Sequence, residues 1–305
     1  MVARIKISEK GPEFSRLCYG AWRIADRDED KTPKAIRSKI DLCLEYGVTT
    51  FDHADIYGDY SCEEYFGGVL AETPSLRDKM EIVSKAGIKL ISNKYPNHKI
   101  KSYDTGRDHL THSVESSLRK LRTDYLDLFL IHRPSPMMDA DETAGALNDL
   151  VKSGKVKHVG VSNFTSAQFQ LLDSRMNKPL VTNQVEVSPL MMDALHDGTI
   201  DLCQRLRISP MAWSPLGGGM LFTDTSPNVV RLRGVLEDLG KKYDMGVAET
   251  AVVWLLTHPS AMIPVVGSNN VDRMKSMFKA VQGGARLTTE EWFEVWQAAA
   301  GVEVP

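Results

Sequence analysis

Residues 33–58 read PKAIRSKIDLCLEYGVTTFDHADIYG, and this stretch predicts one helix followed by one short buried strand. Thr32 is a suitable N-terminal cap, a proline follows it at the first helical position, and apolar residues then recur at helical spacing. Gly47 is suited to end the helix, and Val48–Phe51 is an apolar run typical of a parallel strand. Polar and ionisable residues follow that strand, beginning with Asp52.

The same alternation of helix and strand runs along the chain. Helix-length segments with one apolar face occupy Asp108–Leu121, Asp141–Val151 and Thr165–Leu172. Seven further apolar runs suit buried strands: Leu17–Gly20, Glu81–Ser84, Leu126–Ile131, His158–Val161, Val181–Glu186, Ser209–Trp213 and Met262–Val266. Eight strands alternating with helices predict an α/β fold of the (β/α)8 or TIM barrel class.

A doubly wound sheet is the competing architecture. It normally carries a GxGxxG fingerprint after its first strand, and Gly20–Arg23 does not supply one. No linker rich in proline, serine or glycine divides the chain, so we expect a single domain over residues 1–305. We also expect Arg4–Ile7 to belong to a short hairpin that plugs one barrel end, and extra C-terminal helices near Val271–Ala280 and Thr289–Ala299.

The composition restricts the class of protein. The 305 residues contain 37 Lys and Arg against 40 Asp and Glu, and this net charge of −3 gives no reason to expect nucleic acid or an anionic membrane as partner. Charged residues near the N-terminus interrupt any apolar core of a secretory signal. The uncharged stretch Thr250–Val271 contains prolines and asparagines, which indicate a buried helix, a turn and a strand rather than a membrane span. We therefore expect a cytoplasmic protein whose cysteines are free thiols.

Ionisable side chains follow three of the early strands, at the end where such barrels carry their functional groups. Asp52 and Lys85 end neighbouring strands, so we expect their opposite charges to pair. Tyr57 lies five residues beyond Asp52, where a nearby lysine would stabilise its phenolate and lower its pKa. His132 ends the fourth strand. Each residue alone has a structural interpretation, but four such groups at one mouth predict proton transfer to a substrate oxygen.

These residues occur in motifs that resemble those of the aldo-keto reductases. The motifs are GVTTFDHADIYG at 47–58, the lysine at 85, the histidine at 132, VSNF at 161–164, NQ at 183–184 and WSPLGG at 213–218. The resemblance implies reversible reduction of aldehydes and ketones to alcohols with NAD(P)H and without a metal. It further implies that Tyr57 donates the proton, that Lys85 and Asp52 tune the tyrosine, and that His132 orients the carbonyl.

The resemblance also implies a nicotinamide cofactor site and a substrate wall at Trp22. Amide side chains suit the nicotinamide carboxamide, an aromatic ring suits stacking on the nicotinamide, and consecutive glycines let the backbone approach a pyrophosphate. Without the resemblance, Trp213 would equally suit a core residue at a strand end, and the three consecutive glycines at 217–219 would suit a flexible turn. The implied cofactor residues are Ser162, Asn163, Gln184, Trp213, Ser214, Pro215, Leu216, Gly217, Gly218, Gly219, Gly267, Ser268 and Arg273.

The sequence departs from the family pattern at two positions. Gly267 stands where many relatives have a lysine at the site of the adenosine 2′-phosphate. Arg273 still provides a planar fork for a phosphate, so we expect NADPH rather than NADH as the cofactor. His53 stands where threonine is usual, and we assign it no catalytic role.

Two other function classes remain as alternatives. One is a cofactor-binding regulatory or interaction subunit with little turnover, and the other is a barrel isomerase or hydrolase that uses Asp52 and His132 without nicotinamide. Two long segments, Gly87–Arg107 and Leu216–Asn228, are predicted to be structureless loops above the mouth that act as lids or binding loops. The first contains Lys89, Lys94, Lys99 and Lys101. The sequence names neither the natural carbonyl compound nor the oligomeric state.

Overall fold

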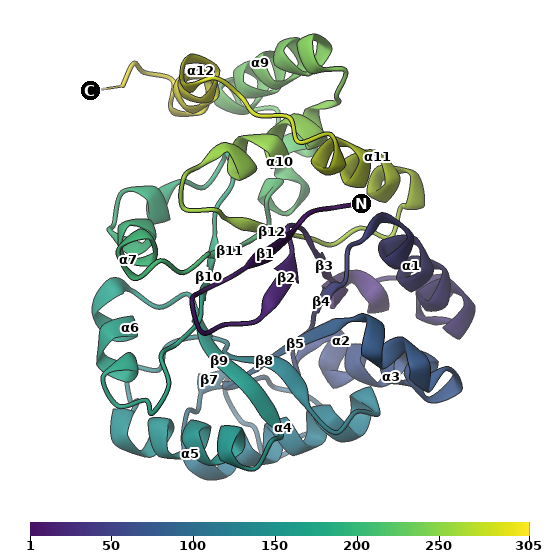
Figure 1. Ribbon diagram of the computed structural model, residues 1–305, viewed down its shortest axis with the longest axis vertical. Helices are drawn as coiled ribbons and strands as arrows, with labels where there is room; N and C mark the ends of the chain where they lie inside the picture. The colour runs from purple at the N-terminus through teal and green to yellow at the C-terminus, as the bar shows by residue number, and fades with distance from the viewer. Residues whose placement is uncertain (305) are drawn as a thin grey trace.

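A closed barrel of eight parallel strands forms the centre of the computed structural model, which describes residues 1–304 (Figure 1). Each barrel strand pairs with the next one along the chain, and the last pairs with the first through Val265 opposite Cys18. The predicted barrel is therefore confirmed. The barrel strands are β3 (Cys18–Gly20), β4 (Thr50–Asp52), β5 (Glu81–Ala86), β8 (Leu126–Ile131), β9 (Val156–Ser162), β10 (Asn183–Glu186), β11 (Met211–Trp213) and β12 (Ile263–Val266).

Helices surround the strands on the outside of the barrel (Figure 1). They are α1 (Pro33–Tyr46), α2 (Tyr57–Tyr60), α3 (Cys62–Glu72), α4 (Arg107–Leu121), α5 (Ala140–Lys152), α6 (Ser166–Asp173), α7 (Thr199–Leu206), α8 (Met220–Thr223), α9 (Pro227–Tyr243), α10 (Val247–Thr257), α11 (Val271–Gln282) and α12 (Thr289–Ala300). The predicted ends of α1 are confirmed, because the Thr32 side chain accepts from the Ala35 amide and Gly47 has φ 80°. Long helix α9, which the sequence analysis did not identify, packs against α12.

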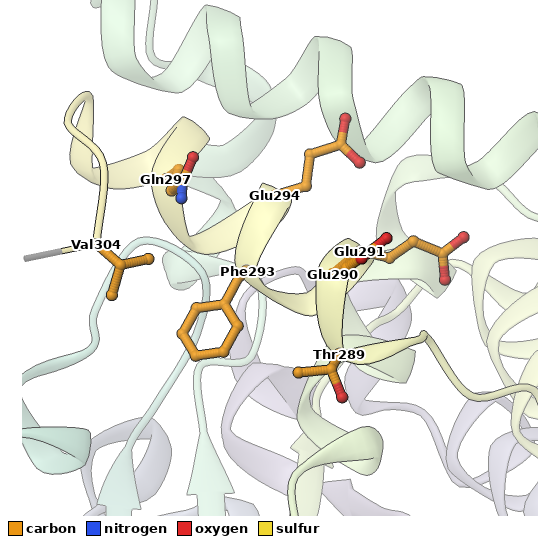
Figure 2. Close-up of a pocket in the computed structure, with 7 residues that line it drawn as sticks. All are labelled: Thr289, Glu290, Glu291, Phe293, Glu294, Gln297 and Val304. Carbon is orange, nitrogen blue, oxygen red and sulfur yellow. The ribbon is translucent and has the colours of Figure 1, made fainter.

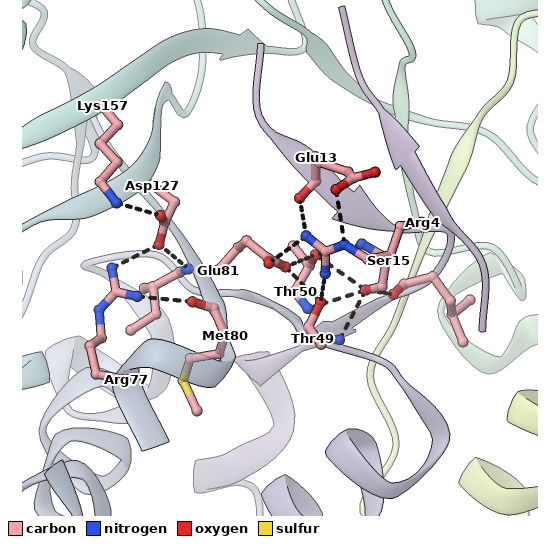
Figure 3. A network of polar contacts seen from close by, with 12 residues as sticks. Arg4, Glu13, Ser15, Thr49, Thr50, Arg77, Met80, Glu81, Asp127 and Lys157 are labelled. Atoms are coloured by element: carbon pink, nitrogen blue, oxygen red, sulfur yellow. Dashed lines mark hydrogen bonds and ion pairs between the residues drawn. The ribbon is translucent and has the colours of Figure 1, made fainter. Parts of the chain in front are cut away.

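The N-terminal hairpin closes the end of the barrel opposite the carboxyl ends of its strands. Strands β1 (Arg4–Lys6) and β2 (Glu13–Ser15) are antiparallel, and the completely buried Ile7 and Phe14 pack against residues of the barrel interior. Arg4 fixes the hairpin to the barrel by donating to the Glu81 carboxylate over 2.8 Å, within the polar network of Figure 3. The predicted plug is confirmed.

The two extra C-terminal helices are also present. Trp292 of α12 stacks on Trp254 of α10 with ring centroids 4.7 Å apart, and each indole N–H donates to the other residue's carbonyl oxygen. A shallow surface hollow lies along α12 beside Val304, and Figure 2 shows Phe293 and several carboxylates at its edge. None of the predicted site residues lines this hollow.

Both predicted structureless loops contain regular structure. Within Gly87–Arg107, strand β6 (Ile88–Lys89) pairs with β7 (Ser102–Tyr103). Within Leu216–Asn228, the chain forms α8 and then enters α9 at its proline. Both predictions of irregular structure were wrong at these places, because pairing of very short strands and one-turn helices leaves little hydrophobic periodicity to read. No helix within residues 1–304 is long and apolar enough to cross a membrane.

Candidate active site

A cavity of about 1670 Å³ opens at the carboxyl ends of the barrel strands. It brings together nearly all of the predicted site residues, which lie at the ends of the barrel strands and in the loops that follow them. Lys85 and Gly217 do not line it: Lys85 is buried behind Asp52, and Gly217 is buried against Leu190. The lining includes Trp22, Asp52, Tyr57, His132, Ser162, Asn163, Gln184, Trp213, Ser214, Pro215, Leu216, Gly218, Gly219, Gly267, Ser268 and Arg273.

Asp52 and Lys85 form the predicted ion pair at the ends of β4 and β5. The Lys85 ammonium lies 2.7 Å from the Asp52 carboxylate and also donates to the His53 carbonyl oxygen over 2.8 Å. The other Asp52 oxygen accepts from the Gln184 amide nitrogen over 2.9 Å. Burial opposes the charge on Lys85, but Asp52 and Tyr57 together outweigh it and the lysine pKa is raised. Lys85 is therefore a fixed positive charge.

Tyr57 stands immediately beyond this pair, at the start of α2. Its ring centroid lies 5.0 Å from the Lys85 ammonium and 5.9 Å from the His132 ring. Burial raises the pKa of Tyr57, and the opposing effect of Lys85 does not overcome it. Lys85 lowers the pKa of Tyr57 as expected, but the sequence analysis did not account for burial, which is the larger effect and raises the pKa. Tyr57 carries its proton at neutral pH.

His132 faces the same side of the cavity from the end of β8. Burial, reinforced by the Lys85 charge, places the pKa of His132 well below its usual range, so the imidazole is neutral. Its Nδ1 atom is buried and has no hydrogen-bond partner within residues 1–304. A neutral imidazole provides one N–H donor and one acceptor, which suits the orientation of a carbonyl oxygen.

Four of the predicted cofactor residues are joined by hydrogen bonds. The Ser162 hydroxyl donates to the Gln184 carbonyl oxygen, and the Asn163 amide donates to that hydroxyl, both over 2.8 Å. The Trp213 indole N–H donates to the Asn163 side-chain oxygen over 3.0 Å. Asn163 and Ser214 have φ of 60° and 49°, a left-handed conformation that non-glycine residues adopt at a cost and that clusters at functional sites.

A glycine cradle continues the cavity away from Tyr57. Gly217, Gly218 and Gly219 have φ of 58°, 65° and 106°, which L side chains rarely adopt. A Cβ added at Gly218 or Gly219 would meet no atom within 4 Å, so their backbone has open space beside it.

The far end of the cavity is formed where β3 and β12 approach each other. A Cβ at Gly267 would lie 3.0 Å from the Gly20 carbonyl oxygen, so the two backbones lie close together here. Helix α11 then begins, with the Asn270 side chain accepting from the Arg273 amide over 2.9 Å. Arg273 is exposed on the first turn of α11.

Trp22 lines the cavity next to Tyr57: it is 56% exposed, and its ring lies 6.4 Å from that of Tyr57. The sequence analysis did not single out Lys101 and Arg133, which also line the cavity. Arg133 directly follows His132, and that adjacency was a usable signal. Lys101 was only one of several loop lysines, and nothing in the sequence distinguishes it from them.

The comparisons with known proteins agree with this geometry. Residues 16–299 match the model of the aldo/keto reductase family. This chain belongs to the aldo/keto reductase family. It is 46% identical to a 6-dehydroglucose reductase of Agrobacterium fabrum, with 99% of each chain covered, and 47% identical to the oxidoreductase YdhF of Escherichia coli over the full length of both.

A solved structure leads to the same assignment. The thermostable aldo-keto reductase Tm1743, crystallised with the inhibitor epalrestat, matches with a TM-score of 0.79 at 26% identity, covering 97% of this chain and 99% of that one. This aldo/keto reductase is therefore an oxidoreductase of a family that acts on carbonyl compounds with nicotinamide cofactors. The assignment argues against a barrel isomerase or hydrolase.

Proposed function

We propose that this aldo/keto reductase reduces aldehydes and ketones to alcohols with NADPH, and that Tyr57 is the proton donor. One observation carries the proposal: Tyr57 and His132 line the same cavity with rings 5.9 Å apart, beside the buried Lys85–Asp52 pair. The carbonyl oxygen lies between the Tyr57 hydroxyl and the His132 imidazole, where both donate to it.

The mechanism follows from where charge develops. A bound nicotinamide would supply a hydride for the carbonyl carbon, and negative charge would then develop on the carbonyl oxygen. Tyr57 gives its proton to that oxygen, and the alcohol forms. The phenolate left behind is stabilised by Lys85, whose ammonium Asp52 holds in place. Gln184 in turn fixes Asp52, so the positive charge is oriented before the reaction begins.

The residues at the rest of the cavity fit an NADP cofactor. Asn163 and Gln184 present amide groups beside Trp213, and the open glycine cradle beyond them allows close approach of a pyrophosphate. The first turn of α11 offers backbone N–H groups to the adenosine 2′-phosphate, and Arg273 offers its guanidinium to the same phosphate. NADH lacks that phosphate, which favours NADPH.

Two relatives, at 46% and 35% identity, are named 6-dehydroglucose reductase. We therefore propose a sugar-derived aldehyde as the first candidate substrate.

The test is the loss of NADPH absorbance when purified protein is mixed with a panel of aldehydes, including sugar-derived ones. Turnover of at least one aldehyde, faster with NADPH than with NADH, is the expected result. Tight NADPH binding without turnover across the panel would instead favour the regulatory subunit.

A further inference from the structure

Three of the four lysines in the segment Gly87–Arg107 donate side-chain hydrogen bonds to other groups of the protein. The fourth, Lys101, makes no ion pair or side-chain hydrogen bond within the part of the chain that the structure describes, and it lines the cavity. The partners of the other three lie at 2.8 to 3.3 Å: Lys89 with the Asp104 carboxylate, Lys94 with the Asp59 carbonyl oxygen and Lys99 with the Pro96 carbonyl oxygen.

The backbone around Lys101 is fixed over the cavity. Lys101 immediately precedes β7, which pairs with β6, so the hairpin fixes the position of its backbone. The Leu90 amide donates to the Tyr60 hydroxyl over 2.9 Å, which attaches the other side of the segment to α2. The Lys101 side chain therefore extends from a backbone segment whose position is fixed by hydrogen bonds.

Arg133 provides a second cation, which comes from the loop after β8. It follows β8, is half-buried, and its guanidinium carbon lies 5.6 Å from the centroid of the Trp213 ring. Within residues 1–304 it makes no salt bridge and no side-chain hydrogen bond, so its five N–H donors are not used by protein acceptors.

Both cations line the same cavity as His132, and both act on its imidazole. After burial and Lys85, the charges of Arg133 and Lys101 are the remaining influences that lower the pKa of His132. Each is close enough to the imidazole to act on it, and both residues line the cavity that His132 lines. A bound substrate would remove water from these two cations. That loss of hydration costs free energy unless the substrate provides hydrogen-bond acceptors in place of the water.

We propose that Lys101 and Arg133 form a donor pair that binds oxygen atoms on the carbons beyond the carbonyl group, so that this reductase prefers oxygen-rich carbonyl compounds to hydrocarbon aldehydes of the same length. This inference rests on the proposed function and narrows its substrate class. Sugar hydroxyls and anionic groups such as phosphate share the required chemistry, because both accept hydrogen bonds from ammonium and guanidinium groups.

Three aldehydes of equal carbon number provide the test: propanal, glyceraldehyde and glyceraldehyde 3-phosphate. The proteins compared are wild type, Lys101→Met, Arg133→Met and, as a matched control from the same loop, Lys99→Met. Because the aldehydes differ in hydration and intrinsic reactivity, each variant is compared with wild type on the same aldehyde. NADPH affinity is measured alongside, since Arg133 contacts Trp213.

We expect Lys101→Met and Arg133→Met each to lower kcat/KM for glyceraldehyde about tenfold, mainly through KM, and to lower that for propanal much less. Lys99→Met should stay within about twofold of wild type on all three aldehydes, because its amine contacts only a backbone carbonyl outside the cavity. A larger loss with glyceraldehyde 3-phosphate than with glyceraldehyde identifies an anion as the preferred acceptor, and equal losses identify hydroxyls.

Two results would overturn the inference. The first is an equal loss on propanal and glyceraldehyde, which would assign the two cations a structural or cofactor role. The second is that Lys101→Met and Arg133→Met behave like Lys99→Met. If wild type reduces none of the aldehydes, the proposed function itself fails and the inference fails with it.

Discussion

The Lys85 ammonium lies 2.7 Å from the Asp52 carboxylate, and the two side chains are only 1% and 3% exposed. Removing two opposite charges from water is costly, and close contact with additional hydrogen bonds repays that cost. The additional bonds here come from Lys85 to the His53 carbonyl oxygen and from Gln184 to Asp52. The pair thus holds a positive charge where a tyrosine phenolate forms during the proposed reaction.

Breaking this pair should destabilise the protein strongly. We expect Asp52→Asn to lower the free energy of unfolding by about 3 kcal/mol, because it leaves Lys85 buried without a counter-charge. Urea unfolding at pH 7 measures the change. The matched control is Asp41→Asn in the exposed Arg37–Asp41 pair, which should cost under about 1 kcal/mol. Equal losses in both variants would contradict the account of the buried pair.

Reduction should be insensitive to pH across the neutral range. Burial lowers the pKa of His132 and raises that of Tyr57, so neither group changes protonation between about pH 6 and pH 9. The kcat for aldehyde reduction at saturating NADPH should therefore be flat over that range and fall only at higher pH, where Tyr57 loses its proton. A loss of activity centred near pH 6.5 would mean that His132 titrates normally.

Glu63 predicts a pH dependence of stability. It is buried, its carboxylate accepts from the Ser84 hydroxyl over 2.6 Å, and burial raises its pKa in spite of that hydrogen bond. The folded state therefore binds more protons than the unfolded state above about pH 4.5, and stability falls as pH rises through that window. Each unit of elevation is worth about 1.4 kcal/mol.

Glu63→Gln removes this titration while retaining an acceptor for Ser84. Relative to wild type, the variant should be more stable at pH 8 and lose that advantage towards pH 4. Exposed Glu64→Gln on the same helix is the control and should change stability little at either pH. Urea unfolding at the two pH values decides the matter, and a Glu63→Gln variant less stable than wild type at pH 8 would refute it.

The preference for NADPH over NADH should depend on Arg273. Its guanidinium is the proposed partner of the phosphate that distinguishes NADPH from NADH, so Arg273→Gln should weaken NADPH binding about tenfold and leave NADH binding nearly unchanged. Fluorescence titration measures both affinities. Lys279→Gln, in the last turn of the same helix, should affect neither. A parallel loss of affinity for both cofactors would place Arg273 elsewhere in binding.

The fold and the position of most predicted site residues could be predicted because barrel topology imposes them. Once eight βα units are recognised, the carboxyl ends of the strands must meet at one mouth, so Asp52, Tyr57 and His132 come together although they are far apart in sequence. The N-terminal plug could be predicted from a local signal, the alternation of polar and apolar residues in Arg4–Ile7.

Features that depend on a balance of solvation or on a single loop geometry could not be predicted. The net direction of the Tyr57 pKa depends on how completely the ring is buried, which no local pattern reports. Lys101 differs from its neighbours only because the β6–β7 hairpin turns it towards the cavity. The burial of Glu63 depends on tertiary contacts of α3, whose Phe66 packs on Phe51 of β4 and whose Glu63 accepts from Ser84 of β5.

The most direct test of the central claim is aldehyde reduction by Tyr57→Phe with NADPH. This substitution removes the hydroxyl that gives the proton and keeps the ring that packs beside His132. We predict a fall in kcat of about 10³-fold or more, with the NADPH dissociation constant within about twofold of wild type. Retention of wild-type kcat by a folded, NADPH-binding Tyr57→Phe protein would contradict the assignment of Tyr57 as proton donor.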